Sequence, residues 1–228
     1  MRQLVRRVEL PDGTPAVLKL TRTAAQEAAA LRAFDGRGSV RLLAENSGAL
    51  LLERAEPGYD LSRLAAVDDR QATSIAASVA RKLWREAPAG FPSVETWEAD
   101  LARDEDASAV FRELVGSMPQ TFFLHGDLHH LNILASGDEW LAIDPKGIVG
   151  ERACEIGPLV LNPVGLLDLA AILNRRIDQL SEELDLDRER ARAWTFVRAV
   201  LAISWAREDR SEVPPVWLTI ATLLRQSV

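Results

Sequence analysis

The chain has 228 residues, which is enough for one large domain or for two small lobes that share a cleft. Apolar residues make up 47% of it and charged residues 27%, an ordinary composition for a globular protein. The formal net charge is -7 and no run of Lys and Arg stands out, which argues against nucleic acid and anionic membranes as partners. This acidity permits a cationic ligand, although solubility is the simpler explanation.

The cysteine content and the hydropathy indicate a reduced, cytoplasmic protein. Cys154 is the only cysteine, so the chain can form neither an intrachain disulfide nor a cysteine-rich metal site. The N-terminus has no apolar core long enough for a signal peptide. No run of about eighteen apolar residues is present, so we expect no transmembrane helix.

The first quarter of the chain predicts strands around one helix. Residues 4–10 and 15–20 flank a Pro-Asp-Gly-Thr turn and predict a hairpin. The Ala-rich stretch 24–34 has helical spacing, and residues 40–44 and 49–55 predict a second hairpin. Pro57-Gly58 then breaks the pattern and marks the expected boundary between two lobes.

The rest of the chain predicts mainly helices. Apolar residues at i, i+4 and i+8 (Ile75, Val79 and Leu83) give the stretch 68–86 an amphipathic stripe. Further helices are expected at 94–104, 166–184, 187–207 and from residue 216 onward. Their Trp, Leu and Ile residues are expected to form a core rather than a ligand site.

One segment, 121–147, interrupts this helical part with strands and polar side chains. A buried strand at 122–124 leads to Asp127, and short strands at 132–135 and 140–143 flank a turn. Asn132 and Asp144 lie six residues on either side of Asp138, so a hairpin folded there brings them to the same end, close to Asp127.

That constellation fits phosphoryl transfer. One carboxylate must orient the hydroxyl group that attacks, and oxygen ligands must hold the Mg²⁺ that bridges the phosphates. Asp127 is therefore the candidate catalytic base, and Asn132 and Asp144 are the candidate Mg²⁺ ligands. The spacing from Asp127 to Asn132 is that of the kinase catalytic loop, Asp-x-x-x-x-Asn.

Several motifs together resemble a known family. The run His-Gly-Asp-Leu-His-His-Leu-Asn at 125–132 resembles the catalytic loop of aminoglycoside phosphotransferases. Ile-Asp-Pro-Lys-Gly at 143–147, Gly-Glu-Arg-Ala-Cys-Glu-Ile-Gly at 150–157 and Asn162-Pro163 resemble the streptomycin 6-kinase and hydroxyurea phosphotransferase branch. The resemblance extends from about residue 15 onward, and the central motifs are its specific part.

The resemblance implies a protein-kinase-like α+β fold of two lobes, with ATP and Mg²⁺ as cofactors. The first lobe, 1–56, would be a small antiparallel sheet with one helix that binds the nucleotide. The second, 57–228, would be larger, mainly helical, and would hold the catalytic loop and the acceptor. The reaction implied is transfer of the γ-phosphate to a hydroxyl group of a small molecule, and the associated biology is antibiotic resistance.

The nucleotide contacts are expected upstream. Lys19 interrupts an apolar strand, as the phosphate-contacting lysine of kinases does, and Glu27 on the next helix would be its ion-pair partner. Taken alone, such residues are more often on the surface. The strand at 49–55 would lead into the hinge that holds adenine, which makes Glu53 and Ala55 candidate contacts through their backbone.

The acceptor contacts are less defined. Glu155, Glu151, Asp104 and Asp100 are acidic candidates for a cationic sugar, with Glu155 first because it follows the metal loop, yet each such residue is more often simply a solvated charge. His125, His129 and His130 make a poor zinc site without a further ligand, and an architectural role in bracing the loop is expected for His125. Cys154 is expected to be a small buried side chain.

The sequence departs from the family pattern at its N-terminus. No glycine precedes Gly13, so the first strand and the Gly-rich phosphate loop are expected to be missing. Such a loss would leave the phosphates less covered and would expose a sheet edge, giving either a monomer or an edge-mediated homodimer. The alternatives to an aminoglycoside kinase are a weak or inactive kinase-like binding protein and a kinase for another hydroxylated metabolite, such as an amino alcohol or a sugar amine.

Overall fold

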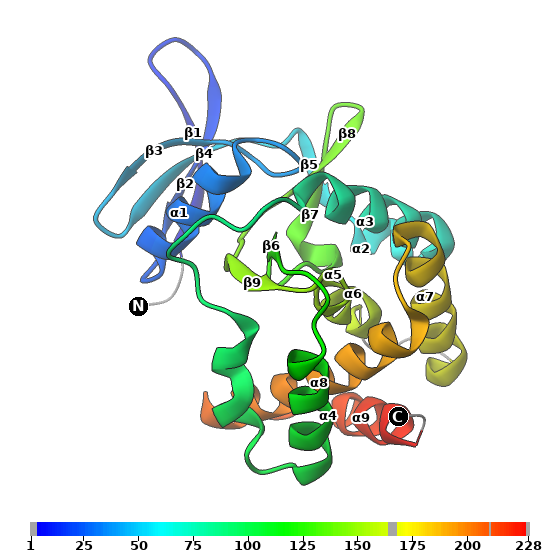
Figure 1. Cartoon of the computed structure of the whole chain (residues 1–228). Coiled ribbons are helices and arrows are strands. Elements are labelled where there is room, and N and C mark those ends of the chain that lie inside the picture. Colours follow the sequence, from blue (N-terminus) through cyan, green and yellow to red (C-terminus); the bar gives the residue numbers. More distant parts are fainter. Residues whose placement is uncertain (1–3, 164–167, 210, 227–228) are drawn as a thin grey trace.

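A computed structural model describes residues 4–163, 168–209 and 211–226. Its strands form a four-stranded sheet at one end of the molecule, and helices fill the opposite end (Figure 1). Two hydrophobic clusters correspond to this division: a small one between the four-stranded sheet and α1 (Ala24–Phe34), and a large one among the remaining helices. No observation tests the expected boundary after residue 56, which stays a prediction.

The four-stranded sheet is antiparallel, in the order β1-β2-β4-β3. Its strands are β1 (Leu4–Glu9), β2 (Pro15–Leu20), β3 (Leu42–Asn46) and β4 (Ala49–Glu53). In the turn between β1 and β2, Thr14 N donates to Asp12 Oδ1 at 2.9 Å, and Gly13 has a φ of 84°. Both hairpins expected from the sequence are therefore present, although the second strand pair begins at residue 42 rather than 40.

A smaller sheet, in the order β5-β7-β8, joins the two ends of the molecule. It consists of β5 (Pro57–Asp60), β7 (Ile133–Ser136) and β8 (Glu139–Ala142). The segment after α1 pairs with it, because Ala142 N donates to Gly38 O at 2.8 Å and Val40 N donates to Ala142 O at 3.0 Å. The end of β8 is thus fixed directly beside the four-stranded sheet.

The register of the β7–β8 hairpin places two candidate residues at one end. Ile133 lies opposite Ala142, and Ile143 N donates to Asn132 O at 2.9 Å. Asn132 is therefore opposite Ile143 rather than Asp144, one residue away from the symmetric pairing that the turn predicts. Asp144 follows at once, so the two side chains still leave the hairpin at the same end. β6 (Phe122–Leu124) pairs with β9 (Ile148–Gly150) alongside.

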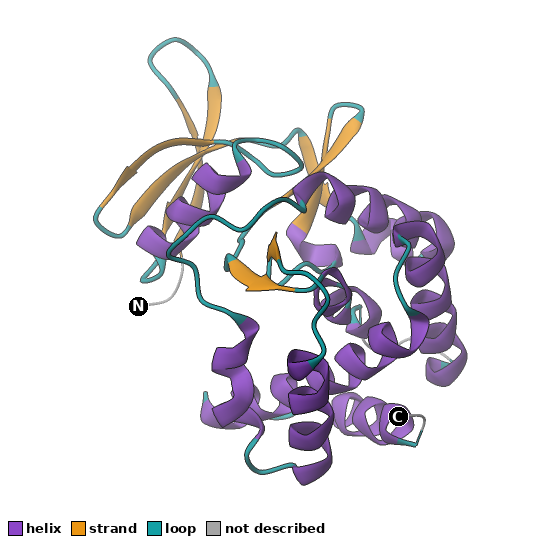
Figure 2. Cartoon of the chain, in the orientation of Figure 1, coloured by secondary structure: helices purple, strands orange, loops and turns teal. Residues whose placement is uncertain are grey.

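Helices make up most of the end opposite the four-stranded sheet (Figure 2), and one of them is buried along most of its length. That helix is α8 (Arg188–Glu208), in which residues 191–201 are all buried. The others are α2 (Ser62–Ala65), α3 (Asp69–Leu83), α4 (Glu105–Gly116), α5 (Arg152–Glu155), α6 (Gly157–Leu161), α7 (Leu169–Leu184) and α9 (Pro215–Arg225), with the 3-10 helices η1 (Val94–Leu101) and η2 (His130–Asn132). A helix buried on all sides carries its charged residues into the core, where each needs a partner or a function.

Three expectations about helices need correction. The helix expected at 68–86 begins one residue later and ends at Leu83, because Asp68 is its N-cap and accepts from Gln71 N. The helix expected at 94–104 is a 3-10 helix that ends at Leu101. Helix α4 was not anticipated, although Asp104 caps it by accepting from Ala107 N. Residues 166 and 167, at the start of another expected helix, lie outside the described residues.

Candidate active site

The loop that carries Asp127 is braced through the His125 ring. Nδ1 accepts from Asp127 N at 3.2 Å, so Nε2 carries the proton and donates to Ile143 O at 2.9 Å. The ring is fully buried, and this burial lowers the pKa of His125 to about 4. A neutral ring with one donor and one acceptor is what the two bonds require. His125 O also accepts from Lys146 N at 2.8 Å, so His125 ties the Asp127 loop to the Asp144 segment.

Glu155 holds the same loop from behind. His125 N donates to its Oε2 at 2.6 Å and Gly126 N donates to its Oε1 at 3.0 Å. The side chain is buried, and burial raises the pKa of Glu155 to about 7 although the two N–H donors oppose the rise. The carboxylate faces the backbone of the loop and lines neither cavity beside Asp127.

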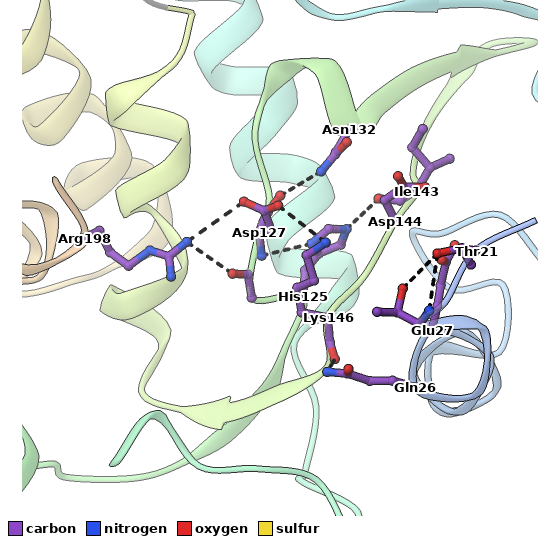
Figure 3. Close-up of polar contacts among 12 residues, drawn as sticks. Thr21, Gln26, Glu27, His125, Asp127, Asn132, Ile143, Asp144, Lys146 and Arg198 are labelled. Carbon is purple, nitrogen blue, oxygen red and sulfur yellow. Dashed lines mark hydrogen bonds and ion pairs between the residues drawn. The ribbon is translucent and has the colours of Figure 1, made fainter. Parts of the chain in front are cut away.

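Asp127 stands at the centre of the candidate site with its carboxylate partly exposed. Asn132 Nδ2 donates to its backbone O at 3.0 Å, which fixes the two candidate residues relative to each other. Two cations flank the carboxylate: Lys146 Nζ lies 3.9 Å from Oδ2 and Arg198 Nη2 lies 4.0 Å from Oδ1. Figure 3 shows Arg198 reaching toward Asp127 from one side, with the His125 ring on the other.

The second group of charges is formed by Lys19, Glu27 and Asp144. Lys19 Nζ lies 2.7 Å from Glu27 Oε2 and 2.6 Å from Asp144 Oδ1, and its side chain is only 4% exposed. Burial raises the pKa of Glu27, although the Lys19 ammonium opposes this. Asp144 has a φ of 60°, in the left-handed region, which costs an L-residue roughly 1 kcal/mol and is common at functional sites. The structure thus brings together the three charged residues that the sequence placed on a strand, a helix and a hairpin.

A cavity of about 210 Å³ lies between the four-stranded sheet and the β7–β8 hairpin. Three of the four expected nucleotide contacts line it, namely Lys19, Glu53 and Ala55, together with Asp144. Its apolar walls come from Val17, Val40, Leu52, Leu134 and Ile143. Glu27 lies behind Lys19 and is not part of the lining. A largely apolar cavity that also holds a cation and a carboxylate can accept a base that carries phosphates.

Two more cavities meet at Asp127, and their charges differ. The first, of about 390 Å³, lies among α6, α8 and α9, and its lining includes the carboxylates of Asp127, Asp209 and Glu212 and the rings of Trp205 and Trp217. The second, of about 340 Å³, lies toward α1 and η1, and its lining includes Lys146, Arg198 and Trp97. Arg198 also lines the first cavity and Asp127 also lines the second. Carboxylates still outnumber cations in the first cavity, which suits a cationic group, whereas cations outnumber carboxylates in the second, which suits an oxyanion.

None of the acidic residues expected to contact the acceptor lines either cavity beside Asp127. Glu155 binds backbone as described. Glu151 is buried and accepts from Arg190 Nη2 at 2.7 Å and from Trp194 Nε1. Asp104 caps α4, pairs with Arg225 and lines a separate cavity of about 350 Å³ together with Asp100. The separation in sequence between these residues and the expected metal loop does not predict the direction in which their side chains point.

Sequence reasoning missed the residues that do line the first cavity. Asp209 and Glu212 were not considered, and the tryptophans of the helical part were assigned to the core. Arg198 was missed as well, because no local pattern distinguishes it within α8. His129 and Asn162, which line the first cavity, and Lys146, which lines the second, belong to the motifs that carry the resemblance, but no contact with the acceptor was expected from them.

The remaining candidates for special chemistry are structural. Cys154 is buried, and burial raises the pKa of its thiol, so it is no nucleophile in this setting. Within residues 4–163, 168–209 and 211–226, no group of three or more His, Cys, Asp and Glu side chains could hold a metal ion by itself. The zinc interpretation of the three histidines therefore has no support.

Comparisons with known proteins agree with this geometry. A family model of aminoglycoside/hydroxyurea antibiotic resistance kinases matches residues 2–210. Hydroxyurea phosphotransferase from Kitasatospora aureofaciens is 39% identical over 233 residues, which cover 92% of this chain and 67% of that protein. Streptomycin 6-kinase from Streptomyces glaucescens is 38% identical over 246 residues, which cover 94% of this chain and 78% of that protein.

A solved structure is similar in fold. Choline kinase LicA from Streptococcus pneumoniae matches with a TM-score of 0.68 at 12% identity, over 99% of this chain and 94% of that one. This likeness confirms the protein-kinase-like α+β fold expected from the sequence. None of the helices among the described residues has the length and apolar character needed to cross a membrane.

Proposed function

Because the chain belongs to the aminoglycoside/hydroxyurea antibiotic resistance kinase family, we propose that it transfers the γ-phosphate of ATP to a hydroxyl group of a small cationic molecule, such as streptomycin. The observation that carries the proposal is the position of Asp127. Its carboxylate borders an acidic, tryptophan-lined cavity on one side. On the other, its loop is tied through His125 to the segment of Asp144, which lines the largely apolar cavity beside the sheet.

Each group then has a task. Asp127 orients the acceptor hydroxyl group and accepts its proton as the new O–P bond forms. Lys19, held by Glu27, contacts the phosphates of the nucleotide, whose base lies in that largely apolar cavity beside Glu53 and Ala55. The buried Glu27 keeps the ammonium in place when the phosphates compete for it.

Asn132 and Asp144 would hold Mg²⁺ only together with the nucleotide. One amide oxygen and one carboxylate are hard oxygen donors suited to Mg²⁺, but they leave most of an octahedral shell to phosphate and water. The Asn132 amide donates through Nδ2 to Asp127 O, which leaves its oxygen for another partner. The chemistry that Mg²⁺ would supply when held by these two residues is positive charge that offsets the negative charge developing during transfer.

The acidic cavity supports a cationic acceptor. Asp209 and Glu212 lie at its exposed rim, and Trp205 and Trp217 offer flat faces to which a guanidinium or ammonium group can stack. A volume of about 390 Å³ is that of a site for a small organic molecule.

A second candidate function is a kinase-like binding protein with weak turnover. It is favoured by residues 4–18, which lead up to Lys19 and contain a single glycine, Gly13, in place of a Gly-rich loop. Backbone N–H donors from such a loop stabilise the transferring phosphate, and each donor lost typically costs about 3 kcal/mol in the transition state. In this case the acceptor would bind in the acidic cavity without ATP consumption.

The test is a panel of acceptors with ATP consumption as the readout. Streptomycin, hydroxyurea, an amino alcohol and a sugar amine are each offered with ATP and Mg²⁺. We expect turnover with streptomycin, and Asp209→Asn with Glu212→Gln should raise its KM by about tenfold without changing the KM for ATP. Glu208→Gln is the matched control, because Glu208, the last residue of α8, is exposed directly before Asp209 and does not line the cavity.

The outcomes separate the candidates. If the chain phosphorylates uncharged hydroxyurea, and the double substitution leaves the rate and KM for hydroxyurea unchanged, the proposal of a cationic acceptor is contradicted. Binding of streptomycin by calorimetry without ATP consumption would favour the binding protein. Absence of both binding and turnover for the whole panel would contradict the acceptor class.

A further inference from the structure

Arg198 projects from the central helix α8 toward Asp127 and is held by two aromatic rings. Its guanidinium carbon lies 4.8 Å from the ring centroid of Trp97 and 5.1 Å from that of Trp205. The two rings stand at 77° to each other, and Trp205 Nε1 donates to Asp100 Oδ2 at 2.8 Å, which fixes the second ring. Arg198 is only 5% exposed. Trp97, in η1, and Trp205, in α8, therefore fix the position of the Arg198 guanidinium.

The stem of Arg198 is fixed as tightly as its head. Gly157, at the start of α6, packs against it so closely that an added Cβ would lie 2.5 Å from Arg198 Cγ and 2.8 Å from Cβ. Gly157 has no positive φ, so close approach alone requires a glycine here. Any side chain at position 157 would therefore displace Arg198 without removing its charge.

Arg198 makes few hydrogen bonds for a buried arginine. Nη2 donates to Gly126 O at 3.3 Å, and Nη1 is buried without a partner among the described residues. Arg176 is the contrast: it is 1% exposed, and its Nε, Nη1 and Nη2 all donate to Asp69 or to backbone oxygens. A buried donor that stays unpaired is costly, so such a group calls for an explanation.

The location of Arg198 explains its unpaired donor. It lines both cavities that meet at Asp127. It also completes the support of the residue before Asp127, because Glu155 accepts from Gly126 N at 3.0 Å while Arg198 donates to Gly126 O. The Gly126 backbone is thus held at its N–H and at its carbonyl by two buried charged groups from different helices.

We propose that Arg198 is a positioning residue for Asp127, clamped by Trp97 and Trp205, and that its unpartnered Nη1 is the donor kept for an oxygen of the bound acceptor. This inference rests on the proposed phosphotransferase function. The clamp sets the direction from which the Asp127 carboxylate meets the hydroxyl group. Misplacement of a reacting group by about 1 Å can cost on the order of 100-fold in rate.

The first experiment measures kcat and KM for four variants with streptomycin and ATP. Arg198→Met keeps most of the stem and should lower kcat on the order of 100-fold, with the KM for ATP unchanged. Arg198→Lys should recover little, because an ammonium is not planar, cannot stack on a ring face as a guanidinium does, and does not donate as a fork. Gly157→Ala should lower kcat by roughly tenfold although every charge remains. Arg192→Met is the matched control, since Arg192 is buried on the same helix, bonds to Asn174 and lines neither cavity.

The second experiment is chemical rescue. Arg198→Ala leaves a slot between the two tryptophan rings that a free guanidinium ion fits. Added guanidinium should raise the turnover of this variant at least about tenfold, and NaCl at equal ionic strength should not. A purely structural arginine would show no such rescue, because its loss would be recorded in the melting temperature instead.

The outcomes distinguish two failures. An active parent enzyme whose Arg198→Met variant keeps its kcat overturns this inference alone, as does a kcat that falls equally in Arg192→Met. A loss of kcat in Arg198→Ala with a parent-like melting temperature and no rescue by guanidinium also overturns it. A parent chain that transfers no phosphate to any acceptor overturns the proposed function, and this inference with it.

Discussion

Two buried cations flank the candidate site, and they are paired in opposite ways. Lys19 has two carboxylates within 2.7 Å, in a setting that the four-stranded sheet and α1 build around it. Arg198 has its nearest carboxylate at 4.0 Å and leaves one donor unpaired. The proposed nucleotide side of the site is therefore electrostatically complete without a ligand, whereas the proposed acceptor side is not. A ligand on the first side must compete for Lys19, and a ligand on the second side supplies what Arg198 lacks.

The strongest test of the acceptor side is Asp127→Asn. The amide cannot accept the proton of the hydroxyl group, so kcat should fall roughly 100- to 10,000-fold. Turnover is measured with the acceptor that gives the highest rate, alongside the melting temperature. Asp138→Asn, in the exposed turn between β7 and β8, is the matched control and should behave like the parent. Near-parent activity in Asp127→Asn would contradict the assigned role of Asp127.

Lys19→Met tests the nucleotide side. Removing one partner of a buried ion pair leaves Glu27 uncompensated, so we expect a loss of unfolding free energy on the order of 3 kcal/mol, together with a higher KM for ATP. Arg198→Met should cost less stability, because Asp127 is 33% exposed and water can solvate it. Urea denaturation of both variants measures the difference. Equal losses would show that the two cations are not paired differently in solution.

Glu155→Gln concerns the support that both sides share. Burial raises the pKa of Glu155 from 4.5 to about 7 in the folded chain. Because the pKa of Glu155 is higher in the folded chain than in the unfolded chain, this group stabilises the fold below pH 4.5. That stabilisation is lost as the pH rises through 7. The unfolding free energy of the parent should therefore fall relative to that of Glu155→Gln between these pH values, by at most about 3 kcal/mol.

Urea denaturation across this pH range measures that difference. His125 and His130 are present in both proteins, so their titration cancels. A difference between parent and variant that does not change with pH would contradict the buried position of Glu155.

The smallest effect is expected at an exposed pair. Lys82 Nζ lies 2.9 Å from Glu139 Oε1, but both side chains are exposed, at 44% and 65%. Lys82→Ala should change the unfolding free energy by less than about 0.5 kcal/mol. Added salt should leave even that small change undetectable in a thermal melt. A larger loss of unfolding free energy would mean that the geometry of an ion pair in this chain matters more for its contribution to stability than its burial does.

The sequence predicted the parts of the site that follow from local pattern. Lys19 is recognisable because a charge interrupts an apolar strand, and Asn132 and Asp144 because a hairpin returns them to one end. The register differed by one residue, since a turn of four residues does not by itself fix which residues pair. Helix α4 could have been found from Asp104 as N-cap and Gly116 at its end.

Other parts could not be predicted, because they depend on tertiary packing. The buried central part of α8 shows no amphipathic stripe, so nothing in its sequence marks Arg198 as the residue that faces Asp127. Glu155 follows the metal loop closely in sequence, yet its direction is set by β6 and the loop, which present backbone N–H groups to it. A carboxylate in a short helix is equally compatible with solvent, ligand or backbone until the fold is known.

The bonds that fix the chemistry converge on His125, Gly126 and Asp127, whereas the rim of the acidic cavity shares none of them. Asp209, Glu212 and Trp217 contribute to that rim from the end of α8 and from the region of α9. Substitutions at the rim can therefore change which molecule fits while the transfer apparatus stays intact. In the proposed enzyme, acceptor preference can therefore change during evolution or by design with little effect on the rate of phosphate transfer.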